Sequence, residues 1–141
     1  MTFIVAVGFA ILSCSKGRDS AFTDAISGTF AREYSFKVIN PETGDEVGIR
    51  TVRDTILIKP IAEMFEVSNH KWARNDYDGE GWRNMLHSDN RPSDTFTGVF
   101  DAVSKVIRPL QEGTAPLLSI DFEKNALFQN GRIEKPFLRV K

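Results

Sequence analysis

Short segments in which apolar and polar residues alternate fill the chain from Gly28 onward. Between Phe30 and Val38 the even positions are aromatic or apolar apart from Arg32, and the odd positions are small or charged. A period of two is typical of a strand that buries one face. Similar segments follow at close spacing, and they are Val52–Lys59, Met64–Trp72, Trp82–Leu86, Thr95–Phe100, Val103–Arg108, Leu117–Phe122, Ala126–Gln129 and Ile133–Val140.

Residues that favour turns separate these segments. Pro presets φ, Gly permits positive φ, and Asp-Gly is a strong hairpin signal. Such residues occur at Asn40–Asp45, Asp78-Gly79, Glu123–Asn125 and Asn130-Gly131. We therefore predict an all-β domain, an antiparallel meander of about eight strands that closes into a small barrel or half-barrel and so hides its edges. A sandwich is the alternative arrangement, and Ala21–Ser27 is predicted as either a short helical turn or part of a flexible tether.

The N-terminal region has the pattern of an export signal. Phe3–Leu12 is an uncharged apolar run, shorter than the roughly 20 residues of a membrane-spanning helix. Ile11-Leu12-Ser13-Cys14 resembles the lipobox of bacterial lipoproteins, in which the cysteine thiol carries a diacylglyceryl group and cleavage occurs just before it. The resemblance implies a signal peptide at 1–13, a lipidated Cys14 with a flexible tether at 14–27, and a folded domain at 28–141. The alternative is a buried first strand or helix in which Cys14 is a small apolar residue.

Composition narrows the classes of function. A chain of 141 residues with 41% hydrophobic and 26% charged residues suits one folded domain. The net charge of −1 lacks the basic excess typical of nucleic-acid-binding proteins, so we expect no nucleic-acid partner. The single cysteine excludes an intramolecular disulfide.

Several strand patterns together resemble one group of proteins. They are Gly28–Phe30, Arg53–Ile58, Phe65–Val67, Phe96–Asp101 and Phe137–Val140. These segments, over most of the mature chain, resemble small lipocalin-like lipoproteins of the Bacteroidota. The resemblance implies a location in the cell envelope, anchored by lipid and expected at the outer membrane.

The segment Gly28-Thr29-Phe30 is also similar to the Gly-x-Trp motif of lipocalins. In that family the aromatic ring plugs the closed end of the barrel, often beneath an arginine from a late strand. The resemblance implies that Arg132 or Arg139 stacks on Phe30 by a cation–π contact.

Candidate metal ligands are few. Asp76–Gly81 imitates the start of a calcium-binding EF-hand loop, but His87 holds the position that needs a bidentate carboxylate. His70 and His87, with Asp76 or Asp78, are the residue types of a zinc or copper site, although nothing in the sequence sets their spacing. We interpret Asp76–Gly81 as a hairpin tip and predict no metal site and no cofactor.

Catalysis is the least favoured function. The chain has no Gly-x-Ser-x-Gly elbow and no glycine-rich phosphate loop, and its only thiol is assigned to the lipid. We therefore expect a non-enzymatic protein.

Two binding hypotheses remain. In the first, inward-facing phenylalanines line a cavity for a small apolar ligand, although the same side chains can equally fill a small barrel. Those candidates are Phe30, Phe36, Phe65, Phe96, Phe100 and Phe122.

In the second hypothesis, the Trp72–Ser93 hairpin contacts an envelope protein, and this chain is an accessory or inhibitor subunit of an envelope assembly. Aromatic and arginine side chains suit such recognition. The candidate residues are Trp72, Tyr77, Trp82 and Arg83. The alternative is that both tryptophans belong to the core or plug its rim.

Overall fold

The computed structural model describes residues 22–85, 94–111, 116–130 and 135–141 of the chain. Over these residues the protein is all-β, as predicted, with one helical turn at 22–26. The strands are β1 Gly28–Ile39, β2 Glu46–Ile61, β3 Met64–Asn75, β4 Arg83–Asn84, β5 Asp94–Asp101, β6 Val106–Pro109, β7 Leu118–Asp121, β8 Ala126–Gln129 and β9 Phe137–Arg139.

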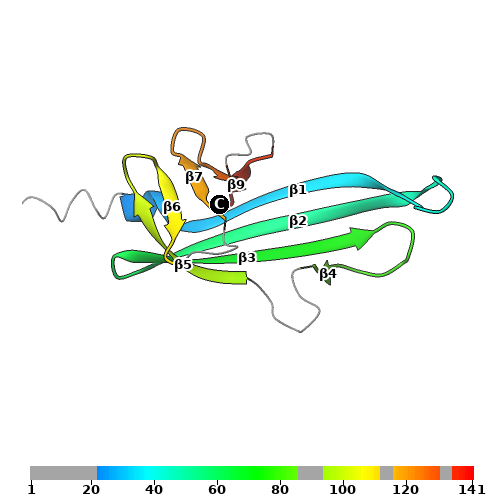
Figure 1. Cartoon of the computed structure of the whole chain (residues 1–141), viewed down its shortest axis with the longest axis horizontal. Helices are drawn as coiled ribbons and strands as arrows, with labels where there is room; N and C mark the ends of the chain where they lie inside the picture. Colours follow the sequence, from blue (N-terminus) through cyan, green and yellow to red (C-terminus); the bar gives the residue numbers. More distant parts are fainter. Residues whose placement is uncertain (1–21, 86–93, 112–115, 131–134) are drawn as a thin grey trace, which may run out of the picture.

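The strands form one antiparallel meander that closes on itself. Of the nine strands in the described residues, all except β4 pair with the next strand around a ring, and β9 returns to β1. Phe30 is paired with Arg139, and the amide of Val140 donates to the carbonyl of Thr29 at 2.8 Å. The barrel-like ring that results (Figure 1) removes the open edges of its short strands.

The inward faces of the ring strands form one apolar core. Alternate residues on each strand face inward, because successive side chains of a strand point to opposite faces. The buried members of the cluster are Ile26, Phe30, Ile56, Ile58, Phe65, Val67, Ile107, Leu118, Ile120, Leu127 and Phe137.

The helical turn at 22–26 covers one end of the ring, which we call the capped end. Ile26 has no exposed surface, and its side chain joins the core. The Phe22 ring lies 6.2 Å from that of Phe100 and 5.9 Å from that of Phe122, measured between centroids. Of the two alternatives for Ala21–Ser27, the described part therefore forms a helical turn, and it packs on the folded domain.

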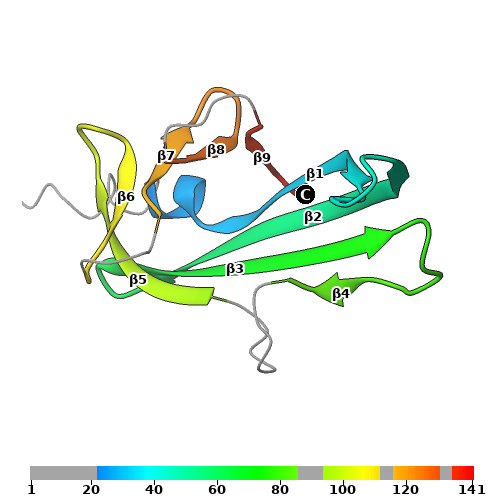
Figure 2. The same ribbon diagram turned by 45° about the vertical axis from the view of Figure 1, so that its right-hand side comes forward.

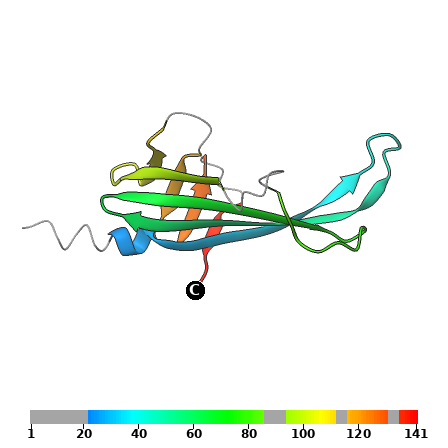
Figure 3. The ribbon, with the colours of Figure 1, turned by 90° about the horizontal axis from the view of Figure 1, so that it is seen from below.

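β1, β2 and β3 are much longer than the strands that complete the ring. β9 pairs with β1 only at Phe30 and Ala31, and β5 pairs with β3 only from Phe65 to Asn69. Beyond these positions the three long strands continue as an extension of the same sheet. We call this extension, with the hairpin that leads to β4, the arm (residues 33–53 and 70–84); Figures 1 and 3 show it projecting away from the capped end.

The strand boundaries differ from the predicted ones at several places. β2 begins at Glu46 rather than Val52, because its outer part pairs with β1 and β3 along the arm. β6 begins at Val106 rather than Val103, because Lys105 adopts a positive φ of 56° and ends a turn there. The predicted Ile133–Val140 strand is shorter in the described residues, where β9 is Phe137–Arg139.

Candidate functional site

Trp82 lies on the outer face of the arm, directly before β4. Its ring sits between two guanidinium groups, with the Cζ atoms of Arg53 and Arg74 at 4.6 Å and 5.3 Å from the ring centroid. Cation–π contacts at exposed sites are worth about 0.5–1 kcal/mol each. The two contacts hold the indole against the sheet.

The strand register places the two arginines on one face. Arg53 on β2 is opposite Trp72 on β3, and Arg74 is two residues further along β3, so all three side chains point the same way. The Glu33 carboxylate accepts bonds from Arg53 Nε and Nη2, at 3.0 and 2.9 Å. Pairing of Trp72 with Asn84 brings β4 beside β3, as Figure 2 shows. We call Arg53, Trp72, Arg74 and Trp82 the arm face.

Much of this aromatic surface is accessible. Trp72 is 37% exposed and Tyr77, on the turn beyond β3, is 40% exposed. Trp82 is half-buried by its two arginines. Gly48 permits Tyr77 to pack on β2, because a Cβ there would lie 2.6 Å from Tyr77 Cδ1. Three of the four partner-binding candidates, Trp72, Tyr77 and Trp82, thus gather on the arm and neither tryptophan belongs to the core.

The fourth candidate, Arg83, is held by the hairpin itself. Its guanidinium donates to the carboxylates of Asp78 and Glu80. Asp78 also accepts a bond of 2.6 Å from Asn75 Nδ2, which is the main reason that its pKa lies below the ordinary value, with the Glu80 amide and Arg83 contributing further. Arg83 therefore shapes the turn that carries Tyr77 and Trp82.

Backbone hydrogen bonds account for the carboxylates of the EF-hand-like segment Asp76–Gly81. Asp76 Oδ1 accepts the backbone N–H of Ile49 at 2.8 Å, and Asp78 Oδ1 accepts that of Glu80 at 3.0 Å. These carboxylates fasten the hairpin to β2 and close its turn. His70 lies on β3 opposite Thr55, while His87 falls outside the described residues. Among the residues that the structure describes, no group of three His, Cys, Asp or Glu side chains is placed to hold a metal ion.

The predicted phenylalanine set divides into two groups. Phe30 and Phe65 are buried in the core, and Phe96, Phe100 and Phe122 are partly buried against it. Phe36 lies on the arm with 46% of its surface exposed, because β1 continues past the ring before this residue is reached. The structure brings five of the six together, in the core cluster or packed against it.

Phe30 and Arg139 form the contact that the lipocalin resemblance implies. Arg139 Cζ lies 4.6 Å from the Phe30 ring centroid. The guanidinium also donates to the carbonyl of Ser27 at 2.6 Å and to that of Ala25, so it fastens the helical turn to the ring. Arg132, the other arginine considered, lies outside the described residues.

A polar group that the sequence analysis did not identify lies inside the opposite end of the ring. Arg32, the misfit in its strand pattern, donates to buried Asp54 on the adjacent strand and to Gln129 Oε1 at 3.3 Å. Asp54 is the charged residue among the inward positions Val52, Ile56 and Ile58. A charged residue in an otherwise apolar inward row was the sequence signal that could have indicated a buried ion pair. Asp54 Oδ1 and Asn69 Oδ1 are buried acceptors with no hydrogen-bond partner among the described residues. Ordered water is the usual partner of such atoms.

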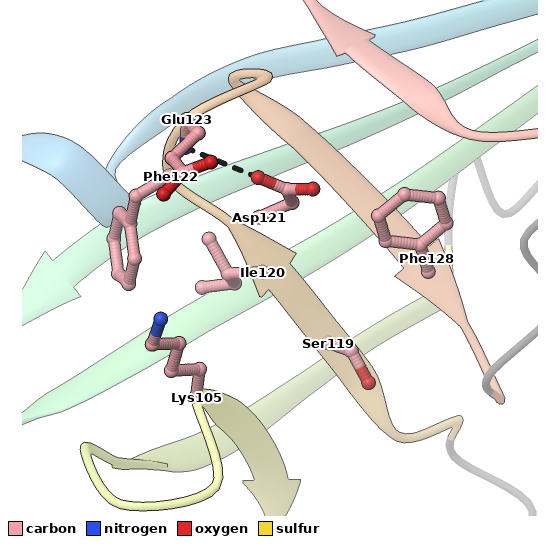
Figure 4. A pocket seen from close by; sticks show the side chains of 7 residues that line it. All are labelled: Lys105, Ser119, Ile120, Asp121, Phe122, Glu123 and Phe128. Carbon is pink, nitrogen blue, oxygen red and sulfur yellow. Dashed lines mark hydrogen bonds between the residues drawn. The ribbon is translucent and has the colours of Figure 1, made fainter.

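Two open grooves of ligand size occur on the described surface. One of about 460 Å³ lies at the capped end, and its lining is Phe22, Thr23, Ile26, Ala62, Glu63, Phe65, Phe100 and Ala102. The other, of about 340 Å³, lies between the β5–β6 and β7–β8 turns (Figure 4), and its lining is Lys105, Ser119, Ile120, Asp121, Phe122, Glu123 and Phe128. In the second groove the Asp121 carboxylate accepts the amide of Glu123 at 3.1 Å, so it serves the turn.

Cys14 and the end of the Trp72–Ser93 segment, residues 86–93, lie outside the described residues. No helix within the described ranges is long and apolar enough to span a membrane.

Comparisons of the chain with protein-family models, with curated proteins and with solved structures found no match.

Proposed function

We propose that this protein is a lipid-anchored, non-enzymatic envelope protein that binds another protein through the arm face. The observation that carries the proposal is the position of Trp82, held between Arg53 and Arg74 on a sheet that the ring does not need for closure. Tryptophan and arginine are the residues most enriched at binding hot spots. Holding the indole in advance reduces the entropy lost when a partner covers it.

The charge of the arm face favours a partner with carboxylates beside apolar side chains. Arg53 and Arg74 are exposed at their strand positions, and Trp72 supplies apolar area next to them. A planar guanidinium binds carboxylates through paired hydrogen bonds and also stacks on aromatic rings. The role we propose is that of an accessory or inhibitor subunit of an envelope assembly.

Anchoring is proposed from the lipobox-like segment that ends at Cys14. A lipid on this residue would hold the domain at a membrane, with the outer membrane as the expected site. Metabolic labelling with a palmitate analogue should mark the wild-type protein and leave Cys14→Ala unmarked. Labelling that persists in Cys14→Ala would exclude this anchor.

A pull-down from detergent-solubilised envelope tests the binding face. Trp82→Ala should weaken recovery of the partner about tenfold or more, as expected for a hot-spot residue. Val103→Ala is the control, because Val103 is 95% exposed on the β5–β6 turn, away from the arm. Equal recovery with wild type and Trp82→Ala would refute the arm face as the binding surface.

A small apolar ligand is the second candidate, and the capped-end groove is the observation that favours it. The groove has a volume of about 460 Å³, within the usual range for ligand sites, and Phe22, Phe65 and Phe100 contribute to its lining. An apolar fluorescent probe should bind the wild-type protein and lose affinity in Phe22→Ser. Probe binding that is unchanged by this substitution would exclude the groove.

A further inference from the structure

The outer part of β1 has an unpaired edge among the described strands. Its inner edge pairs with β2 along the whole strand, whereas β9 pairs with the other edge only at Phe30 and Ala31. Val140 N–H donates to the Thr29 carbonyl, so the odd-numbered residues of β1 direct their backbone groups towards the β9 side. The backbone groups of Glu33, Ser35 and Lys37 consequently face away from β2. Such an edge is a template for another strand.

We propose that this edge pairs with the same edge of a second copy of the chain, in an antiparallel arrangement with its two-fold axis at Ser35. In that register Ser35 is opposite Ser35 of the second copy. Glu33 is opposite Lys37 of the second copy, and Tyr34 is opposite Phe36. Because the axis is two-fold, each of these contacts occurs twice. The long strands β1, β2 and β3 of the two arms then form one continuous run of six strands.

Charge complementarity selects this register. Glu33 accepts bonds from Arg53 within its own chain, and Lys37 Nζ lies 2.6 Å from Glu46 Oε2. Pairing around Ser35 therefore joins four strands in a row of alternating charges: Arg53, Glu33, then Lys37 and Glu46 of the second copy. An axis at Glu33 or Lys37 would instead place two like charges directly opposite each other, which is destabilising.

The other face of the same strand gains aromatic contacts. Phe36 is 46% exposed on the arm, and the half-buried Tyr34, whose ring centroid lies 4.7 Å from Lys135 Nζ, is two residues before it on the same face. Opposite residues of an antiparallel pair lie close enough for aromatic side chains to pack across the strands. The proposed register covers both Phe36 side chains with Tyr34 of the other copy. A single register thus supplies hydrogen bonds to the backbone edge, pairs opposite charges and covers the exposed Phe36.

Co-expression of two copies of the full chain with different tags tests the proposal. Wild-type copies should be recovered together. Glu33→Lys alone, or Lys37→Glu alone, places two pairs of like charges in each dimer, and we expect co-recovery to fall about tenfold. When one copy carries Glu33→Lys and the other Lys37→Glu, both contacts join a lysine to a glutamate again. Co-recovery of this mixed pair should rise well above that of either variant alone, and it need not reach the wild-type level because the Glu33–Arg53 and Lys37–Glu46 contacts are lost.

The mixed pair also controls for folding, because it contains the same two chains that fail to pair with themselves. Lys124→Glu is the control for a change of charge, since Lys124 is exposed on the β7–β8 turn. Its co-recovery should match that of the wild type. The proposal is overturned if wild-type copies are not recovered together, or if the mixed pair is recovered no better than either variant alone. The partner pull-down with Trp82→Ala is independent of both results.

Discussion

Arg32 and Asp54 form an ion pair inside the ring, with Arg32 Nη2 2.7 Å from Asp54 Oδ2. The two residues are directly opposite each other in the β1–β2 register, and the Asp54 side chain is only 2% exposed. Arg32 Cζ also lies 4.0 Å from the Phe137 ring centroid, and Nη1 donates to the carbonyl of Lys135 at 3.0 Å. A single arginine thus connects β1 and β2 with the segment that leads into β9, where the ring closes.

Removal of Asp54 should strongly destabilise the fold. Asp54→Ala leaves the Arg32 guanidinium in a largely buried place without its counter-ion, and losing one partner of a buried pair typically costs about 3–5 kcal/mol. Urea unfolding followed by circular dichroism measures this loss. The double variant Arg32→Met/Asp54→Ala should be more stable than Asp54→Ala alone, since no charge remains buried. A double variant that is less stable than the single one would contradict this account.

The guanidinium shape of Arg139 should matter as much as its charge. Arg139→Lys keeps a positive charge but cannot both stack on Phe30 and donate to the carbonyls of Ala25 and Ser27. We expect a loss of about 1–3 kcal/mol from the unsatisfied carbonyl groups and the weaker stacking. Hydrogen exchange should show faster exchange of the Ser27 amide, which donates to the Thr23 carbonyl. Exchange at wild-type rates would show that Arg139 does not hold the helical turn.

Gly98 should not tolerate a side chain. A Cβ at this position would lie 2.7 Å from Ile107 Cγ2 and 2.9 Å from the carbonyl oxygen of Arg108, so β5 and β6 would have to separate. Overpacking of this kind costs about 1–3 kcal/mol. Gly81→Ala is the matched control, because a Cβ there meets no atom within 4 Å. Thermal unfolding should separate the two variants, and equal melting temperatures would contradict the prediction.

Asp101 should make the β5–β6 turn sensitive to acid. Its carboxylate accepts the Ser104 hydroxyl at 2.7 Å and the Val103 amide at 3.0 Å, with the Ser104 hydroxyl the largest cause of a pKa below the ordinary value. A lowered pKa in the folded state means that the ionised group stabilises the fold above the unfolded pKa of about 3.9. This stabilisation is lost as the pH falls through the lower, folded pKa.

The carboxyl chemical shift of Asp101, measured by NMR against pH, checks the direction of the change. Its midpoint should lie below that of an unfolded peptide containing the same turn. Asp101→Asn should remove this part of the acid dependence of unfolding while leaving that of Asp121, whose pKa the Lys124 amide chiefly lowers. A midpoint at or above the peptide value would refute the role assigned to the turn.

Local patterns were sufficient to predict the fold class. Ala126–Gln129 is a strand as predicted, and Asn125 and Asn130 beside it adopt positive φ values of 49° and 51°. Strand alternation and turn chemistry act over a few residues, so they can be read without knowing the partners of a strand. The meander topology could be predicted as well, because strands joined by short turns usually pair with their neighbours in sequence.

Contacts between distant residues were the part that local patterns could not supply. Nothing near Phe36 in the sequence indicates that β1 leaves the ring after Ala31, because that depends on how short β9 is. The same holds for Trp82, whose position between Arg53 and Arg74 depends on the register of three strands.

By itself, the sequence determined that the domain is an all-β antiparallel meander, and its N-terminal pattern predicts the lipid attachment at Cys14. Only the tertiary structure decided that the meander closes between β1 and β9, that Asp54 is the counter-ion of Arg32, and that the arm carries the exposed aromatic surface. The physical reason is that alternation specifies which face of a strand is buried. Strand length and register, which are set by the whole sheet, specify what each face meets.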